Sequence, residues 1–591
     1  MSTEKTQAAA GARIKRLSIE RYRGLDKLTW YPGANVNLII GGGDVGKTTI
    51  LDAISLLFSP ISSTTISDVD YRNRETENGF EIEAVISLPD DEVNHLSKMV
   101  WPWVWDGKEL KQPALDDEPS AQEPAIQHVY CVRVRGTPDL DLIYEICNPD
   151  ETYETFTAGL RRKIGLVKLS GEERNDRDLR LVQGSALDAL LSDKGLRGRL
   201  GQQFAGQDVQ EHLKVDAKEA LQKLDKSFLK EVLPSGLGLG LVGGYGFSIG
   251  SLIGLTAIKG EVSLPVSSWG AGTRRLASLT VAGAMQTGAP FVVIDELERG
   301  LEPYRQRGLV KLLFSKSSQV FLTTHSSTVL SEAAEATLWY VDASGHIGEL
   351  PKQKISSHQA KDPEAFLARL TIVGEGITEV GFAAELIERS LNGKLGDYGI
   401  WITDAGGNDA ALELLEAFAQ GHLKFGGLVD YEGRFPERWK KVGLGIGSLI
   451  LQWKEGCLEK NIIELIDDEC LEKLIEDPEA EKTGDRLRTL ADRLGIHQKD
   501  FQSIRHKAGG NLKQLIIDAA TGAVPADVPD GDKKAFKKHS TRWFKSNAGG
   551  RELARKIFSL KIWPDLKPQL LPFLNSIREN VGLKHIKDIQ L

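Results

Sequence analysis

The chain has 591 residues, which is too long for one hydrophobic core, so we expect two or three domains. With 41% hydrophobic and 27% charged residues, its composition is that of an ordinary globular protein and not of a disordered one. A formal net charge of -9 excludes a surface that coats nucleic acid throughout, so any DNA contact must be a local basic patch.

The N-terminal segment and the cysteines indicate the compartment. The opening residues, MSTEKTQAAAGARIKRL, lack an apolar core of the length that a signal peptide requires. Cys131, Cys147, Cys457 and Cys470 are far apart and form no CxxC pair, so their spacing indicates neither a zinc site nor a disulfide framework. We expect a cytoplasmic protein.

A glycine loop with the sequence GGGDVGKT occupies residues 41–48. Alternating residues at 13–30 and an apolar run at 36–40 predict strands before it, and residues 48–58 predict a helix after it. In such a P-loop the backbone N–H groups approach phosphates, the lysine reaches the β and γ phosphates and the hydroxyl ligates magnesium. We therefore predict that ATP is bound by Gly41, Gly43, Asp44, Gly46, Lys47, Thr48 and Thr49, with Thr48 also a ligand of Mg²⁺.

Three segments separate this loop from the next motif. Residues 101–123, with three tryptophans, predict a surface insertion, and residues 170–233 predict a helical insertion that could serve as a dimerising arm. The uncharged stretch 232–258 is long enough to span a bilayer. Its eight glycines and its period-two alternation favour buried sheet and loop instead.

A second nucleotide motif is FVVIDE at 291–296. An apolar strand that ends in adjacent acids is the Walker B pattern, in which Asp295 would hold Mg²⁺ and Glu296 would orient or deprotonate the attacking water. Upstream lies SSWGAGTRR at 267–275, and downstream TTHS at 323–326 ends another apolar strand.

The order of these motifs resembles that of ABC ATPases. The upstream segment resembles the signature, through Ser268 and Gly270, and His325 resembles the switch histidine that senses the γ phosphate. The resemblance implies that two copies sandwich ATP, hence a homodimer or higher homo-oligomer through the ATPase domain. Residues 295–303, DELERGLEP, resemble ABC proteins that act on DNA ends. No Gln occurs between Thr49 and Lys111, where the family's Q-loop is sought, and Asp68 could substitute.

Strands and helices alternate again after about residue 364. LTIVGEG at 370–376, a helix over 378–391, GIWITDAGG at 399–407, a helix over 409–420 and FGGLVDYEG at 425–433 predict a parallel sheet. Four acids, Glu375, Glu379, Asp430 and Glu432, can converge at the carboxyl edge of that sheet. Oxygen ligands of this kind suit Mg²⁺ or Mn²⁺.

This pattern resembles a Toprim domain, with Glu432 in place of the second Asp of its DxD strand. The resemblance implies two-metal cleavage of phosphodiester bonds. Glu464, or alternatively Glu459, would add a ligand, and Lys545 would stabilise charge on the phosphate, with Lys556 in reserve. The basic stretch 533–556, in which Trp543 and Phe544 could stack on bases, is either a DNA contact or a solvated helix face.

An ABC ATPase followed by Toprim resembles the OLD (overcoming lysogenization defect) family, which includes the Gabija nuclease and some retron effectors. The expected fold is α/β: ATPase domain at 1–169 and 234–355, helical insertion at 170–233, and Toprim nuclease with a helical C-terminal region at 364–591. The resemblance implies an anti-phage DNA endonuclease with ATP and Mg²⁺ or Mn²⁺ at two sites, possible co-encoded helicase or reverse transcriptase partners with retron RNA–DNA, and no membrane. The alternative is an ATP-driven DNA clamp or repair scaffold with a silent Toprim fold; topoisomerase, primase and transporter readings fit the motifs less well.

Overall fold

The structure is a computed structural model, and it describes residues 11–59, 65–88, 101–113, 127–169, 177–182, 185–191, 193, 196, 210, 213–241, 253–284, 291–342, 344–453, 455–525, 528 and 530–589. The chain forms two compact units, one up to Lys352 and one from Gln353 onward. None of the described helices is both long and apolar enough to cross a membrane.

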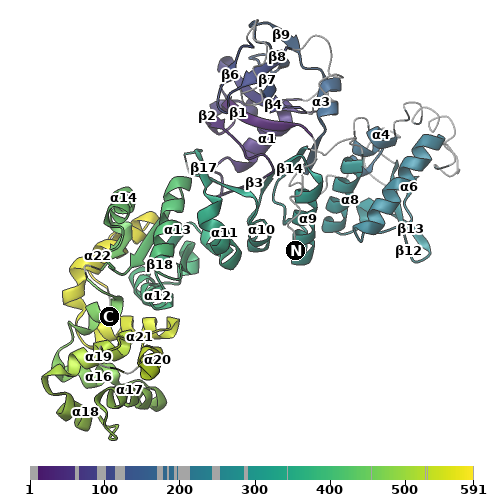
Figure 1. The fold of residues 1–591 in the computed structure, drawn as a ribbon. Coiled ribbons are helices and arrows are strands. Elements are labelled where there is room, and N and C mark those ends of the chain that lie inside the picture. The colour runs from purple at the N-terminus through teal and green to yellow at the C-terminus, as the bar shows by residue number, and fades with distance from the viewer. Residues whose placement is uncertain are drawn as a thin grey trace. The chain divides into compact units, whose positions relative to one another are not determined.

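The first unit contains two large sheets (Figure 1). The antiparallel sheet has the order β2-β1-β4-β7-β5-β6, and β8 and β9 extend it from β7. Its strands are β1 Arg13–Tyr22, β2 Leu25–Trp30, β4 Phe80–Ser87, β5 Trp103–Trp105, β6 Leu110–Lys111, β7 Gln127–Gly136, β8 Leu142–Cys147 and β9 Tyr153–Thr155. The predicted surface insertion at 101–123 therefore contributes two short strands, and its residues 114–123 lie outside the described part.

The second large sheet has the order β10-β14-β15-β3-β16-β17 and is parallel except for β17. Its strands are β3 Val36–Gly41, β10 Leu166–Leu169, β14 Phe291–Ile294, β15 Gln319–Thr323, β16 Thr337–Val341 and β17 Ile347–Leu350. Helix α1, Lys47–Leu57, packs its apolar side chains with residues of both large sheets in one buried cluster. The P-loop follows β3, and the Walker B acids follow β14. Because both strands are parallel to β15, which lies between them, the two motifs lie at the same edge of the sheet.

The remaining elements of this unit are short helices and a smaller packed group. The former are η1 Asp68–Asp70, η2 Arg72–Arg74, η3 Thr76–Asn78, α3 Ala158–Ile164, α9 Pro303–Lys316 and α10 Ser327–Glu332. The packed group comprises η4 Arg177–Leu179, α4 Ala186–Leu191, α6 Val215–Lys230, η6 Val266–Ser268, α8 Ala271–Ala284 and the antiparallel strands β11 Gly238–Leu241, β12 Ile253–Lys259 and β13 Val262–Pro265. Its hydrophobic core thus runs from the predicted helical insertion into residues beyond 233, and residues 242–252 lie outside the described part.

The second unit is built on the parallel sheet β19-β18-β20-β21, which confirms the parallel pairing predicted from the alternation. Its strands are β18 Leu370–Gly374, β19 Ile400–Asp404, β20 Phe425–Val429 and β21 Ile450–Gln452. The chain leaves β18 toward β19 and then returns to pair β20 on the other side of β18. At such a switch point the two connections diverge and open a crevice at the carboxyl ends of the strands.

Helices surround this sheet and form the C-terminal region. Those in the sheet region are α11 Lys352–Lys361, η7 Pro363–Phe366, α12 Ile377–Leu391, η8 Leu395–Tyr398, α13 Asn408–Gly421, α14 Pro436–Ile446 and η9 Gly447–Leu449. The C-terminal ones are α15 Leu458–Ile463, η10 Asp468–Cys470, α16 Leu471–Ile475, α17 Ala480–Leu494, α18 Phe501–Ala508, η11 Gly509–Asn511, α19 Leu512–Thr521, α20 Asp530–His539, η12 Ser540–Arg542, α21 Asn547–Ser559 and α22 Trp563–Asn580. One buried cluster joins side chains of the sheet to side chains of the C-terminal helices, so this region packs against the sheet as part of the same core.

Candidate nucleotide and carboxylate sites

The P-loop has the backbone that its glycines predict. Gly46, at φ 98°, caps the N-terminus of α1, and Gly41 has φ 150°. A Cβ at Gly41 would lie 2.5 Å from the carbonyl oxygen of Val341, so no larger side chain fits there. The buried Lys47 ammonium donates to the carbonyl oxygens of Gly41, at 3.0 Å, and Gly42, at 2.5 Å. Burial lowers the pKa of Lys47, and the nearby acids, Asp295 first, oppose that shift.

The two predicted magnesium ligands meet across the sheet edge. Thr48 Oγ1 donates to Asp295 Oδ2 at 3.2 Å, and Asp295 Oδ1 accepts a 2.6 Å hydrogen bond from Thr323 Oγ1. The Thr323 hydroxyl also accepts from the backbone N–H of Glu296 at 2.8 Å. Glu296 itself is partly exposed and has a left-handed backbone, φ 49°. A hydroxyl and a carboxylate at this distance form a donor set that suits Mg²⁺.

The signature-like segment and the histidine are exposed. Ser268 ends η6 and Gly270 directly precedes α8, and the Ser268 hydroxyl donates to the Pro265 carbonyl oxygen at 2.7 Å. The backbone N–H of His325 donates to Glu298 Oε1 at 2.7 Å, so Glu298 positions the histidine loop. Sequence reasoning missed Glu298, although it lies in the acidic run after the Walker B strand.

Two further contacts bear on this site. The Arg275 side chain donates to the carbonyl oxygens of Asp295 and of Arg299, which ties the signature helix α8 to the Walker B loop. Asp68, the predicted substitute for a Q-loop glutamine, forms a 2.8 Å hydrogen bond with Arg74 Nε at the surface. The structure therefore gives Asp68 a partner other than the nucleotide loop.

In the second unit, Glu375 and Asp430 meet at the switch point. They follow β18 and β20, and Glu375 Oε2 accepts from the backbone N–H of Asp430 at 2.9 Å. Asn408, at the start of α13, donates its amide to Glu375 Oε2 at 2.8 Å and to the carbonyl oxygen of Asp430 at 3.0 Å. Asn408 thus joins three loops at this edge, a role that sequence reasoning did not assign. Asp430 Oδ1 accepts from the backbone N–H of Leu458 at 2.9 Å.

Glu379, Glu459 and Lys545 complete this group. Glu459 is 0% exposed, and its Oε1 lies 2.9 Å from Lys545 Nζ. Glu379 is also buried, and neither Glu379 Oε1 nor Glu459 Oε2 has a hydrogen-bond partner among the described residues. Buried carboxylate oxygens without partners are costly unless a proton or a cation neutralises them.

Burial and neighbouring charges shift the pKa values of Glu379, Asp430 and Lys545 in this site. Burial, followed by the charge of Glu459, raises the pKa of Glu379 to about 7. Burial, followed by the charges of Glu379 and Glu375, raises the pKa of Asp430 to about 8. Burial opposes the charge on Lys545, but Glu459 and Glu379 outweigh it and raise the pKa of the lysine. The site is therefore an anionic pocket with one resident cation.

Close packing of two helices at glycine residues brings Lys545 beside these acids. A Cβ at Gly550 would lie 2.1 Å from the carbonyl oxygen of Thr378, and one at Gly381 would lie 2.0 Å from that of Asn547. Helices α12 and α21 can therefore approach only because both residues lack a side chain. Lys545 directly precedes the N-cap of α21, Ser546, so this close packing brings it beside the first turn of α12.

Three predicted residues are not in this group. Glu432 accepts a 3.0 Å hydrogen bond from Arg434 Nε and faces solvent. Glu464 is half exposed, and its Oε1 lies 3.7 Å from Lys460 Nζ. Of the two acids proposed as a further ligand, Glu459 is therefore the one that faces the site. The Lys556 ammonium donates to the carbonyl oxygens of Lys473 and Glu476, which gives it a structural role.

The basic stretch 533–556 does not offer aromatic stacking, so that prediction is wrong. Trp543 is 4% exposed and donates from Nε1 to Thr489 Oγ1 at 2.9 Å, and Phe544 is fully buried. Both aromatic side chains therefore pack in the hydrophobic core. Arg542 pairs with Asp485 at 2.9 Å. Four exposed lysines of this stretch lie on α20: Lys533, Lys534, Lys537 and Lys538.

One family model matches part of the first unit. Residues 146–331 match the family described as "AAA domain, putative AbiEii toxin, Type IV TA system". Similar solved structures include an Smc head bound to the C-winged helix domain of ScpA (16% identity, TM-score 0.36, 58% of this chain and 99% of that chain) and the SMC head domain from Thermotoga maritima (15%, 0.30, 57% and 99%). The recombination mediator RecF matches at 15% identity with a TM-score of 0.34, over 58% of this chain and 100% of that chain.

These structural similarities are too low to carry an argument about function, and no curated protein matches the sequence. The family match includes the Walker B acids and His325. Together with the P-loop geometry, it supports a P-loop ATPase fold for the first unit.

Proposed function

We propose that this chain is an ATP-binding, metal-dependent DNA endonuclease of the OLD family, whose second unit is a Toprim domain that cleaves phosphodiester bonds under control of the ATPase unit. One observation carries the proposal. Glu375, Glu379, Asp430, Glu459 and Lys545 gather at the switch point of a parallel sheet, where such sheets bind ligands.

The residues fit divalent metal ions. Glu379 and Glu459 each offer a buried oxygen without a partner among the described residues, and burial and mutual repulsion raise the pKa values of Glu379 and Asp430, an effect that a bound cation would offset. Hard oxygen ligands of this kind would hold Mg²⁺ or Mn²⁺, which would supply an activated water and charge stabilisation. No three of these carboxylates bring one oxygen each within 4.8 Å of one another in the described residues, so they would have to close around an ion.

The protein's own groups have distinct roles in this proposal. Glu375, Glu379, Asp430 and Glu459 would be the metal ligands. Glu375 also holds the backbone of Asp430 in place, with Asn408 supporting both. Lys545 would offset the negative charge that develops on the phosphate, since a fixed cation in a buried site stabilises a transition state strongly.

The ATPase unit would regulate cleavage through a second copy of the chain. Exposed Ser268 and Gly270 would cover ATP that the partner binds, while Lys47, Thr48 and Asp295 hold ATP and Mg²⁺ in the same chain, and Glu296 and His325 act on the γ phosphate. A role in anti-phage defence and a co-encoded helicase or reverse transcriptase partner rest on the family resemblance alone.

The test is a nicking assay with purified full-length protein, supercoiled plasmid and Mg²⁺ or Mn²⁺, with and without ATP. We expect metal-dependent cleavage that Glu379→Gln abolishes. Glu413→Gln is the matched control, because Glu413 is exposed on α13 and away from the carboxylate group. No cleavage by the wild type, or equal cleavage by both variants, would overturn the nuclease proposal.

The second candidate is an ATP-driven DNA clamp with a silent Toprim fold. Two observations favour it: Glu432 pairs with Arg434 at the surface, and no three of the remaining acids bring one oxygen each within 4.8 Å of one another in the described residues. This candidate predicts ATP-dependent DNA binding with a metal affinity that Glu379→Gln leaves unchanged. Metal binding measured by calorimetry on the wild type and on Glu379→Gln distinguishes the clamp from the nuclease.

A further inference from the structure

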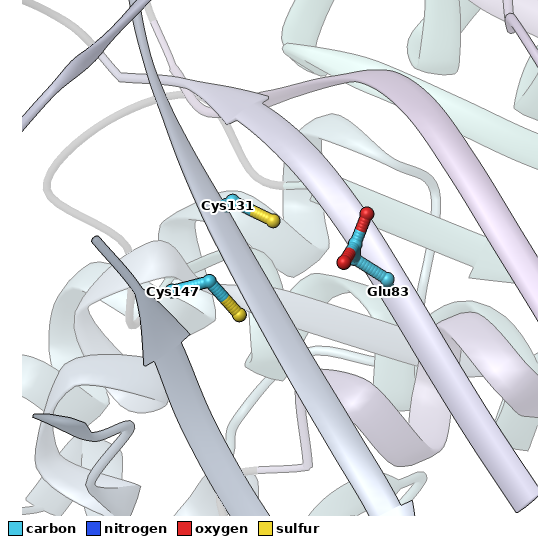
Figure 2. Close-up of side chains that lie close together, drawn as sticks. All are labelled: Glu83, Cys131 and Cys147. Atoms are coloured by element: carbon cyan, nitrogen blue, oxygen red, sulfur yellow. The ribbon is translucent and has the colours of Figure 1, made fainter. Parts of the chain in front are cut away.

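A second group of metal-binding side chains lies in the antiparallel sheet of the first unit. Glu83, Cys131 and Cys147 each offer one ligand atom, and these atoms lie within 4.8 Å of one another. Figure 2 shows the three side chains on neighbouring strands, with the Cys131 sulfur directed toward the Glu83 carboxylate. The proposed ATPase and nuclease reactions use none of the three.

Strand register brings them together. Cys131 on β7 lies opposite Cys147 on β8 and opposite Val85 on β4. Glu83 is two residues from Val85, so its side chain is on the same face of the sheet as both thiols. Directly opposed residues of antiparallel strands have Cβ atoms about 4.5–5.5 Å apart, which lets two thiols reach one ion.

The ligand types and distances fit a specific class of metal. Two thiolates and a carboxylate are a soft-to-borderline set that favours Zn²⁺ over Mg²⁺ or Ca²⁺. A tetrahedral Zn²⁺ with bonds of about 2.3 Å to sulfur needs its sulfur atoms about 3.8 Å apart, and ligand atoms that all lie within 4.8 Å of one another are compatible with such a site.

The surroundings complete the site. Cys131 is 2% exposed, whereas Glu83 and Cys147 are partly exposed and leave a path for an ion. Arg16 Nη2 donates to Glu83 Oε1 at 2.7 Å, which leaves the other oxygen for a metal and orients the carboxylate. Outer-shell partners of this kind fix and tune metal ligands.

We propose that Glu83, Cys131 and Cys147 form a zinc site that links strands β4, β7 and β8. The fourth position would be held by water. The site would fasten β8, and β9 beyond it, to the centre of the sheet that packs on α1.

The experiment uses the full-length protein, reduced, stripped of metal with a chelator and titrated with Co²⁺ as a spectroscopic probe for Zn²⁺. We expect thiolate-to-cobalt charge-transfer absorption that saturates at one Co²⁺ per chain and disappears when Zn²⁺ is added. Cys147→Ser should abolish this absorption, whereas the control Cys470→Ser, in the second unit, should retain it. Glu83→Gln, which keeps both thiols, should weaken Zn²⁺ binding at least about tenfold, because loss even of an outer-shell partner costs 10- to 100-fold.

Three results would overturn the proposal. They are a wild type without thiolate absorption, an absorption that Cys147→Ser leaves unchanged, and a Cys131–Cys147 disulfide in the protein purified without reductant. Equal Zn²⁺ affinity of Glu83→Gln and wild type would remove Glu83 from the site and leave only a dithiol. Retained ATP binding by Cys147→Ser shows that this variant is folded, and the Glu83→Gln comparison tests the site should it not fold.

Discussion

Replacing Lys545 with methionine separates the catalytic from the structural role of the lysine. The change keeps a long unbranched side chain and removes the charge that faces Glu459, which is 0% exposed and 2.9 Å away. Removing one partner of a buried pair costs about 3–5 kcal/mol, because the other charge is left uncompensated. Lys545 is 34% exposed, so solvent reaches the pair, and we take about 3 kcal/mol, the lower end of that range.

The expected effects are measurable on both stability and cleavage. For a unit of the size of residues 353–591, 1 kcal/mol corresponds to about 2–4 °C, so the melting temperature of this unit should fall by about 6–12 °C. Plasmid nicking should fall about 10²- to 10³-fold, the loss that follows removal of one group that stabilises a charged transition state.

The double variant Lys545→Met with Glu459→Gln provides the control. It removes the uncompensated buried charge, so most of the lost melting temperature should return while cleavage stays low. Calorimetry and plasmid nicking on the wild type, Lys545→Met, Glu459→Gln and the double variant measure both quantities. Cleavage by Lys545→Met within twofold of wild type would refute the catalytic role, and an unchanged melting temperature would refute the buried ion pair.

Further predictions concern the nucleotide site, pH and helix packing. Asp295→Asn should lower ATP hydrolysis about 10²-fold or more, since a bound metal contributes several kcal/mol of charge stabilisation; phosphate release measures this, and unchanged turnover would contradict the assignment. The pKa values of Asp430, about 8, and Glu379, about 7, lie above those of unfolded carboxyls, so the folded metal-free chain holds more protons. Its unfolding free energy should therefore fall as pH rises from about 5 to 8, and bound Mn²⁺ should flatten that slope. Denaturant titrations of the metal-free chain measure this, and an unfolding free energy that rises with pH would contradict the raised pKa values. Gly550→Ala should cost about 1–3 kcal/mol and reduce cleavage, because its Cβ meets a backbone carbonyl at 2.1 Å. Gly484→Ala, on α17 with open space around it, should be neutral or stabilising by up to about 1 kcal/mol, and equal melting temperatures for the two variants would argue against the packing constraint.

Contiguous motifs could be predicted from the sequence because their geometry depends on a few neighbouring residues. The P-loop needs Gly41 and Gly46 in backbone conformations that only glycine adopts readily, and both have positive φ. The helix predicted over 378–391 spans Ile377–Leu391, since apolar spacing reports which side of a helix is buried. In the same way, the alternation of strands and helices predicted the parallel sheet and the acids at the carboxyl ends of its strands.

Contacts between distant segments could not be predicted from local pattern. Glu459 and Glu464 are both acids of one short segment, and only the packing of α15 decides that Glu459 is buried beside Lys545 while Glu464 is half exposed. Trp543 and Phe544 looked available for stacking because they lie among lysines and arginines, yet they fill the core of the second unit.

The order of residues along the chain thus determined the nucleotide loop, the Walker B acids and the strand ends that carry Glu375 and Asp430, because each depends on backbone periodicity over a few residues. The tertiary structure decided which acids and which lysine share a pocket and which thiols face each other across two strands. The shared pocket depends on the close approach of α12 and α21, which are more than 100 residues apart in the chain, and the facing thiols depend on the register of β7 and β8.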